Sequence, residues 1–307
     1  MKNDIDRSST KQVVVITGGA GGMGQATAKL LGRSHHCILS DVRENLLDRA
    51  KQELERNGIH CDTVVSDITS KSSVEELMAY AEQVGPIASL IHTAGVSPQM
   101  GDAAFIIKVN ALGTIRVNEA FFDIAQEGAS LINVASMAAH MMPSFLVSPR
   151  RYAPAFSDPE KLIRRLTRFT KWFPKKARPG LAYGISKNFV VWYSKTQARK
   201  FGQKGVRILS VSPGTFETPM GELEKKSGAY AITQYSALSR VGKVDEIAQL
   251  LAFCASSKAG YLTGTDILCD GGTVASITRL HQWRLHSGAR SPHRGTESKP
   301  EANISTQ

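Results

Sequence analysis

The chain has 307 residues, of which 42% are hydrophobic and 21% charged, and this composition excludes collagen-like and mainly disordered proteins. A chain of this length buries a core large enough to fold without disulfide bonds or a structural metal ion. Its four cysteines are too scattered to predict a disulfide framework or a zinc site. The net charge of +11 is concentrated in residues 143–182, with ten basic and two acidic side chains, and in residues 273–307, with five and two.

Short apolar segments bounded by Gly, Asp, Ser or Pro alternate with amphipathic stretches of helical period. Near-continuous apolar strands that alternate with helices are typical of a parallel sheet covered on both faces. The pattern predicts an α/β fold, a Rossmann-type doubly wound seven-stranded parallel sheet in one domain over residues 1–272. The predicted strands are 13–17, 37–41, 61–65, 87–93, 131–136, 206–211 and 265–269, and the predicted helices are 23–33, 43–57, 71–84, 102–127, 182–202 and 243–256.

The first predicted strand is followed by a glycine-rich segment, residues 17–24 with the sequence TGGAGGMG, which opens directly into a helix. Glycines let a pyrophosphate approach the backbone, and a helix N-terminus offers unpaired N–H groups and a partial positive charge. The strand before it and the helix after it favour a dinucleotide-binding loop over an ordinary glycine-rich loop. We expect cofactor contacts from Gly18, Gly22, Met23 and Gly24.

Two acidic residues close the second and third predicted strands. Asp41 lies 17 residues beyond Gly24, where a carboxylate accepts hydrogen bonds from a ribose 2′-OH and repels a 2′-phosphate. NAD is therefore favoured over NADP, although Arg43 lies nearby. Asp67, followed by Ile68, either meets the adenine amino group or caps the next helix, and the sequence does not decide between these roles.

Further motifs occur in the order found in the short-chain dehydrogenase/reductase family. The glycine-rich segment resembles the TGxxxGxG motif of that family, and residues 183–187, YGISK, match its YxxxK motif. The chain is identified as a member of the family because the matches span residues 12–272. The remaining matches are KVN at 108–110, LINVAS at 131–136, SPGT at 212–215 with Thr218-Pro219, and DGG at 270–272.

The resemblance implies four catalytic residues, Ser136, Tyr183, Lys187 and Asn110. Tyr183 and Lys187 are four residues apart and so share a helix face. A tyrosine with a pKa of about 10 is a poor base, but an adjacent ammonium and a cationic nicotinamide lower that pKa. Ser136 would donate a hydrogen bond to the substrate oxygen, Lys187 would also hold the cofactor ribose, and Asn110 would hold a water that links Lys187 to solvent.

One motif departs from the family pattern. The sequence after the fourth strand is His92-Thr93-Ala94-Gly95 instead of NNAG. The small Ala94 and Gly95 still leave room for the cofactor, but the Asn that braces the central strand is absent. His92 is either a proton-active group or a core histidine paired with the backbone, and we favour the second. The expected cofactor contacts on the nicotinamide side are Pro213, Gly214 and Thr218.

The connection between Ser136 and Tyr183 holds an insert, residues 143–181, with a predicted amphipathic helix at 159–173 that begins after an N-cap at Asp158. We expect a lid over an apolar pocket, whose apolar stripe faces the substrate or the core. Two alternatives are a clamp for an anionic or acyl-CoA-type substrate and a helix that docks on an acidic membrane surface. The stripe consists of Leu162, Leu166, Phe169 and Phe173.

An enlarged segment at this place also resembles the bacterial 3α-hydroxysteroid dehydrogenase/carbonyl reductase subgroup, as do Pro98-Gln99 and the run 213–219. In that subgroup the segment covers the helix pair through which most relatives dimerise. The resemblance therefore implies a homodimer in preference to the commoner homotetramer.

We expect an NAD-dependent oxidoreductase that interconverts a secondary alcohol and a ketone, with a hydrophobic, steroid-like substrate. An NAD-binding regulator that recruits an acidic partner is the alternative from another class, and the Ser136, Tyr183 and Lys187 set argues against it. A nucleic-acid partner is not expected, because the charge lies on an insert and a tail, not on a face of the core. We also expect no metal site and no transmembrane segment, a cytoplasmic location, and a disordered tail at 273–307.

Overall fold

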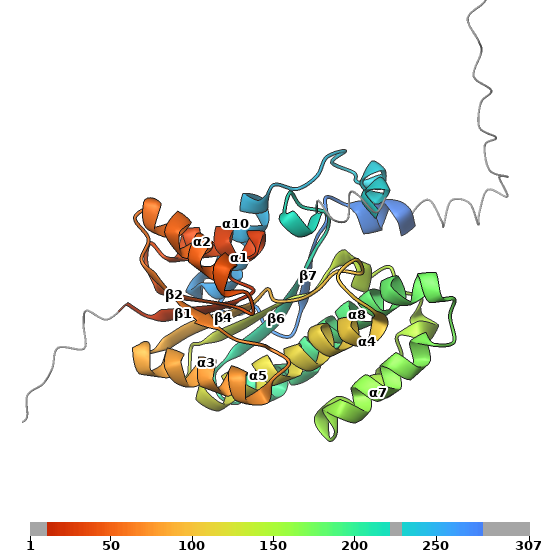
Figure 1. Cartoon of the computed structure of the whole chain (residues 1–307), viewed down its shortest axis with the longest axis horizontal. Coiled ribbons are helices and arrows are strands. Elements are labelled where there is room, and N and C mark those ends of the chain that lie inside the picture. The colour runs from red at the N-terminus through yellow and green to blue at the C-terminus, as the bar shows by residue number, and fades with distance from the viewer. Residues whose placement is uncertain (1–10, 222–228, 279–307) are drawn as a thin grey trace, which may run out of the picture.

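The computed structural model describes residues 11–221 and 229–278 (Figure 1). Its strands form one parallel sheet in the order β3-β2-β1-β4-β5-β6-β7. The strand order reverses between β1 and β4, and ligands of doubly wound sheets bind at the carboxyl ends of the strands at such a point. The predicted fold is confirmed. The strands are β1 (Val13–Thr17), β2 (His36–Asp41), β3 (Cys61–Val65), β4 (Ile87–His92), β5 (Ser130–Val134), β6 (Arg207–Pro213) and β7 (Asp266–Cys269).

Helices cover both faces of the sheet (Figure 1). One face carries α1 (Gly22–Leu31), α2 (Glu44–Arg56) and α10 (Val244–Ala255), and the other carries α3 (Lys71–Val84), α5 (Gly113–Ile124) and α8 (Arg178–Gly202). Both helix layers bury apolar side chains on the strands, so the strand residues are apolar on both sides, as the continuous apolar runs predict.

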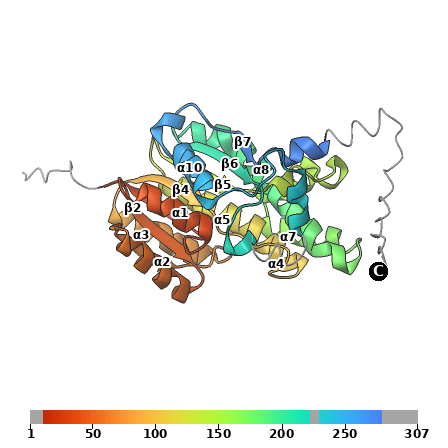
Figure 2. The same cartoon turned by 90° about the horizontal axis from the view of Figure 1, so that it is seen from above.

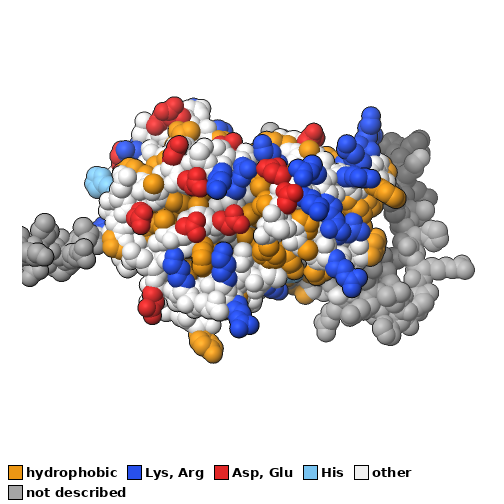
Figure 3. All heavy atoms as spheres, turned by 90° about the horizontal axis from the view of Figure 1, so that it is seen from below, with side chains coloured by type: hydrophobic (Ala, Val, Ile, Leu, Met, Phe, Trp, Pro, Cys, Tyr) orange, Lys and Arg blue, Asp and Glu red, His pale blue; other side chains and the backbone are white. Residues whose placement is uncertain are grey.

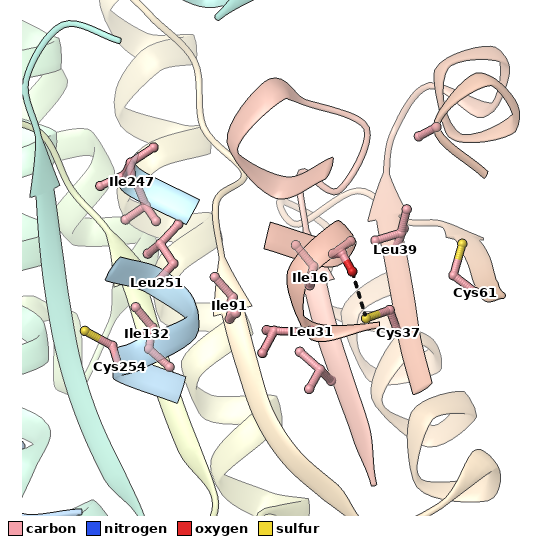
Figure 4. Packing of buried hydrophobic residues seen from close by; sticks show 14 of the residues in the cluster. Ile16, Leu31, Cys37, Leu39, Cys61, Ile91, Ile132, Ile247, Leu251 and Cys254 are labelled. Atoms are coloured by element: carbon pink, nitrogen blue, oxygen red, sulfur yellow. Dashed lines mark hydrogen bonds between the residues drawn. The ribbon is translucent and has the colours of Figure 1, made fainter. Parts of the chain in front are cut away.

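The core on the α1–α2–α10 face is drawn in Figure 4, where Ile91 and Ile132 on the strands lie beside Leu251 on α10. Cys37 and Cys254 are fully buried in this core and are free thiols. Burial raises the pKa of the Cys37 thiol to about 12, so the residue acts as a small hydrophobic side chain and not as a nucleophile.

The predicted single helix at 102–127 is divided in the structure. It consists of α4 (Ala103–Ile107), a π-helical turn η1 (Lys108–Leu112) and α5. The π-helical turn contains Asn110, which is buried. Single π-helical turns within α-helices are frequent at functional sites, because the extra residue changes the direction of the side chains.

The insert folds onto the body of the protein. It contains α6 (Pro149–Tyr152) and α7 (Pro159–Thr170), and the Asp158 carboxylate caps α7 by accepting from the Lys161 N–H at 2.8 Å. Leu162 and Leu166 are fully buried in a cluster with side chains of α4 and α8. The apolar stripe therefore faces the core at Leu162 and Leu166, and the lid role of the insert stays a prediction. The helix ends at Thr170, three residues before the predicted end, and the N–H groups of residues 171–173 each donate to a carbonyl three residues earlier, as in turns.

The basic face of α7 stays exposed, and Lys and Arg side chains gather at this end of the molecule in Figure 3. Figure 2 shows α7 beside α4 and α8. The remaining segments are short helical turns, η2 (Met137–Ala139), η3 (Ser144–Leu146), η4 (Ala153–Phe156), η5 (Lys175–Ala177), η6 (Ala229–Tyr235) and η7 (Ser257–Ala259).

The end of the described chain departs from one expectation. Residues 273–278, the first part of the tail that the sequence predicts to be disordered, are helical. The rest of that predicted tail lies outside the described residues. Within the described ranges, no helix is long and apolar enough to cross a membrane.

Candidate active site

The glycine-rich loop between β1 and α1 is packed so closely that side chains have no space there. Gly18 has a φ of +67°, and a Cβ on it would lie 2.7 Å from the Ala94 nitrogen. A Cβ on Gly24 would lie 2.6 Å from the Gly18 carbonyl oxygen. In the described structure, no side chain caps the N-terminus of α1 at Gly21. These features fit the pyrophosphate of a dinucleotide, since the first N–H groups of the helix stay available to an anion.

The end of β4 holds this loop in place. The Thr93 hydroxyl donates to the Thr17 carbonyl oxygen at 2.8 Å. His92 is fully buried between two hydroxyls, with Nδ1 2.7 Å from Thr17 Oγ1 and Nε2 3.2 Å from Thr114 Oγ1. His92 is thus the expected core histidine, but its partners are side-chain hydroxyls and not the backbone. His92 and Thr93 supply the bracing that the missing Asn would give.

The protonation state of His92 follows from its neighbours. The Thr114 hydroxyl donates to the Asn110 carbonyl oxygen at 2.8 Å, so it accepts from His92 Nε2, and Nδ1 then accepts from the Thr17 hydroxyl. Burial and, to a smaller extent, the positive charge of Lys187 lower the pKa of His92 to about 3. His92 is therefore a neutral structural residue at physiological pH.

Asp41 lies at the carboxyl end of β2, and its side chain is only 8% exposed. The carboxylate accepts from the backbone N–H of Arg43 at 3.2 Å and from its guanidinium Nε at 3.1 Å. The guanidinium is about half exposed. Asp41 and Arg43 therefore form a pair at the place where a ribose is expected, and the pair partly neutralises the carboxylate.

Asp67 is exposed and does not cap α3. Its carboxylate accepts from the N–H of Thr69 at 2.8 Å and from the Thr69 hydroxyl at 3.0 Å, which forms a local turn. The helix α3 is capped by Ser70 instead, so the capping alternative is wrong. Ile68 is buried, and a Cβ on Gly113 would lie 2.6 Å from its Cδ1.

Tyr183, Lys187 and Ser136 come together near the carboxyl end of β5. Tyr183 is partly exposed on α8, whereas Lys187, one turn later, is buried. The Lys187 ammonium lies 6.0 Å from the centroid of the Tyr183 ring and donates to the Val134 carbonyl oxygen at 3.0 Å. Ser136 lies two residues beyond Val134 and accepts from the Ala138 N–H at 3.2 Å, so it caps the turn η2.

Asn110 connects the π-helical turn to both neighbouring segments. Its side-chain carbonyl accepts from the Val96 N–H at 2.9 Å, and its amide donates to the Val96 carbonyl oxygen at 3.0 Å and to the Ser186 hydroxyl at 3.2 Å. A Cβ on Gly95 would lie 3.1 Å from the Asn110 Oδ1 and 3.2 Å from the Lys187 Nζ. Glycine at position 95 thus lets Asn110 and Lys187 approach each other.

The loop after β6 completes this edge of the sheet. A Cβ on Gly214 would lie 2.6 Å from the Asp270 Cα. Thr218 accepts from the Gly221 N–H at 3.0 Å, and its side chain faces the N-terminus of α1, where a Cβ on Gly22 would lie 3.3 Å from the Thr218 Cβ. The predicted contacts of Pro213, Gly214 and Thr218 with a cofactor stay predictions.

The sequence did not point to three residues whose side chains hold the turn after Ser136 in place. Asn188, next to Lys187, donates to the Ala139 carbonyl oxygen at 3.0 Å. His140 Nε2 lies 2.8 Å from a carboxylate oxygen of Asp266 on β7. No motif marks these positions, because their roles depend on tertiary contacts.

In the part of the chain that the structure describes, no group of His, Cys, Asp and Glu could hold a metal ion.

Comparison with known families divides the chain at the insert. Residues 12–149 match the family described as short chain dehydrogenase, and residues 170–274 match the family described as Enoyl-(Acyl carrier protein) reductase. The residues between these two matches, 150–169, include all of α7 except its last residue, Thr170. Nearly the whole insert helix therefore lies outside both matched regions.

Individual proteins resemble the chain over most of its length. The Short-chain dehydrogenase/reductase bsc3 of Alternaria brassicicola is 29% identical over 279 residues, which cover 88% of this chain and 98% of that protein. The 3beta-hydroxysteroid dehydrogenase 2 of Eggerthella lenta is 28% identical, with 86% and 95% covered. The crystal structure of a short chain dehydrogenase from Burkholderia cenocepacia in complex with NADP has a TM-score of 0.68 at 21% identity, with 86% and 98% covered.

Proposed function

The chain belongs to the short-chain dehydrogenase/reductase family of NAD(P)-dependent oxidoreductases, and we propose that it interconverts a secondary alcohol and a ketone. The observation that carries this proposal is the grouping of Ser136, Tyr183 and Lys187 beside a glycine-rich loop that fits a dinucleotide. A bound nicotinamide supplies or accepts the hydride. The protein supplies the proton and holds the reacting oxygen.

Tyr183 is the proposed proton donor and acceptor for the substrate oxygen. The buried ammonium of Lys187 stabilises the deprotonated tyrosine, because a positive charge beside a phenol favours its ionised form. Ser136 donates a hydrogen bond to the same oxygen and stabilises the negative charge that develops on it. Asn110, fixed by three hydrogen bonds next to Lys187, is the residue that we propose to hold a water that returns the proton to solvent.

NAD is the proposed coenzyme in preference to NADP. The support is the Asp41 carboxylate at the carboxyl end of β2, which would repel a 2′-phosphate. Arg43 weakens this repulsion through its ion pair with Asp41, so we propose a moderate preference. Met23 on α1, together with Asp67, Ile68 and Ala94, remains among the proposed cofactor contacts.

A hydrophobic secondary alcohol is the proposed substrate class. The likeness to a 3β-hydroxysteroid dehydrogenase supports this choice. An anionic substrate is the second candidate, favoured by a cavity of about 270 Å³ between α4, α7 and α8 that Lys171, Lys175 and Arg178 line. Pro179 also lines this cavity and shares a helix face with Tyr183. One carboxylate in the lining, that of Asp102, already caps α4.

The test is a spectrophotometric screen for reduced nicotinamide with NAD and then NADP. The substrates are secondary alcohols that include 3-hydroxysteroids, with hydroxyacyl-coenzyme A thioesters beside them. Turnover of the neutral alcohols supports the proposal. Turnover of the thioesters alone, lost in a Lys171→Ala/Lys175→Ala variant, would replace it with the anionic class. Coenzyme binding without any turnover would instead favour a regulator.

A further inference from the structure

The hydroxyl of Ser136 is positioned by a short turn, residues 136–140. Ser136 Oγ accepts from the Ala138 N–H at 3.2 Å, and the Ser136 carbonyl oxygen accepts from the Ala139 N–H at 2.9 Å. Both bonds lie within the turn itself. A shift of this turn therefore moves the hydroxyl relative to Tyr183, and displacements well below 1 Å matter for a group that must meet a substrate oxygen.

Side chains from α8, β6 and β7 hold the turn. Asn188 on α8 donates its amide N–H to the Ala139 carbonyl oxygen at 3.0 Å. On the other side, His140 Nε2 lies 2.8 Å from Asp266 Oδ2 and 3.2 Å from the Ser212 hydroxyl. Of these contacts, the one made by Asn188 lies nearest to the proposed catalytic residues, since Asn188 follows Lys187 directly in the chain.

Asn188 is itself oriented by the insert. The hydroxyl of Tyr152, at the end of α6, lies 3.1 Å from the Asn188 Oδ1 and 3.3 Å from the Ile185 carbonyl oxygen. The Ala139 carbonyl oxygen can only accept, so the amide nitrogen of Asn188 must face it, and Oδ1 faces Tyr152. Burial raises the pKa of Tyr152, so its hydroxyl remains a donor at every working pH.

The ring of Tyr152 is fixed independently of its hydroxyl. It is fully buried, packs edge-on against Phe189 at 5.4 Å between centroids, and lies tilted against Trp192 at 5.3 Å. Removal of the hydroxyl alone therefore leaves the packing of the ring in place, and only the bonds to α8 are lost.

We propose that Tyr152 is a positioning residue for the reaction, through which the insert holds Asn188 and thereby the turn that carries Ser136. The connection runs from Tyr152 to Asn188 and then to Ala139 in the turn. It gives the insert a role in catalysis that does not require it to move or to contact substrate. The inference rests on the proposed function, because it assigns Ser136 to the substrate oxygen.

The first test compares Tyr152→Phe with a matched control, Tyr193→Phe. Tyr193 is also fully buried, also packs on Phe189, at 5.3 Å, and its hydroxyl also makes a hydrogen bond, with Gln197 at 2.9 Å. Nothing in these contacts connects Tyr193 to the turn. We expect kcat to fall about tenfold in Tyr152→Phe, with KM and coenzyme affinity unchanged, because the lost interaction acts on transition-state geometry. Tyr193→Phe keeps the wild-type kcat.

The second test is a double-mutant cycle with Asn188→Ala. If Tyr152 acts through Asn188, the double variant is no slower than Asn188→Ala alone, so the two effects on kcat do not multiply. Multiplying effects, or equal kcat values in Tyr152→Phe and Tyr193→Phe, would overturn the inference. Equal losses of thermal stability with unequal kcat would exclude a general loss of folding as the cause.

Failure of the proposed function has a different result. In that case the wild type shows no turnover in the alcohol screen, and the Tyr183→Phe variant does not differ from it. When the wild type is active and Tyr183→Phe is inactive, a Tyr152→Phe variant with full kcat contradicts only the positioning role.

Discussion

The buried histidine at the end of β4 gives a stability prediction with a definite sign. His92 is neutral in the folded protein, with a pKa lowered to about 3 by burial and by Lys187. In the unfolded chain its pKa returns to about 6.5. The unfolded state therefore binds one proton more than the native state between these two values, and stability must fall as the pH falls below about 6.5.

The size of the effect follows from the distance to the unfolded pKa. A pH of about 5 lies about 1.5 units below the pKa of His92 in the unfolded chain. Protonation of His92 therefore stabilises the unfolded state by about 2 kcal/mol at that pH. The loss continues towards the folded pKa. For a protein with about 5–15 kcal/mol of total stability, this is a large fraction.

The assay is urea unfolding followed by circular dichroism at about pH 8 and at about pH 5. Other groups also titrate in this range, so the quantity to compare is the difference between wild type and His92→Asn. Asparagine does not titrate, and the variant should lose about 2 kcal/mol less than the wild type over this interval. The matched control is His60→Asn, because His60 is exposed, and it should lose as much as the wild type.

Parallel loss in wild type and His92→Asn would refute the reasoning. It would mean that His92 is protonated in the folded state, and that the pair of hydroxyl bonds to Thr17 and Thr114 does not describe its surroundings.

Two further predictions concern the coenzyme and the insert. Asp41→Ala frees Arg43 for a 2′-phosphate and should reduce the kcat/KM ratio of NAD over NADP at least tenfold; an unchanged ratio would remove Asp41 from its proposed role. Leu166→Ala removes a fully buried side chain between α7, α4 and α8, so the free energy of unfolding should fall by about 2–5 kcal/mol, and a loss below about 0.5 kcal/mol would mean that α7 is not part of the core.

Local patterns sufficed for most of the fold. The strands and helices were predictable because apolar periodicity reports which faces are buried, and the boundary at Asp158 was predictable because a capping side chain lies beside the helix it caps. The division of the helix at 102–127 was not predictable. The π-helical turn around Asn110 is stabilised by bonds to Val96 and Ser186, which are distant in sequence.

The residues of the candidate site also divide into those that a local sequence pattern marks and those whose roles depend on contacts distant in sequence. Ser136, Tyr183 and Lys187 could be named because a family motif marks each of them. His92 could be placed in the core, but its hydroxyl partners come from β1 and α5 and leave no local pattern. Asn188 and Tyr152 carry no signal of their own, since their roles arise from a contact between the insert and α8.

The most direct test of the central claim is the turnover of Tyr183→Phe beside its coenzyme affinity. Phenylalanine keeps the ring near Lys187 and removes only the hydroxyl that is proposed to exchange the proton. The account predicts that oxidation of the best secondary alcohol falls by at least about 10²–10⁴-fold, while NAD binds as tightly as in the wild type. A variant that keeps most of its activity would contradict the account, since the proton would then have another route.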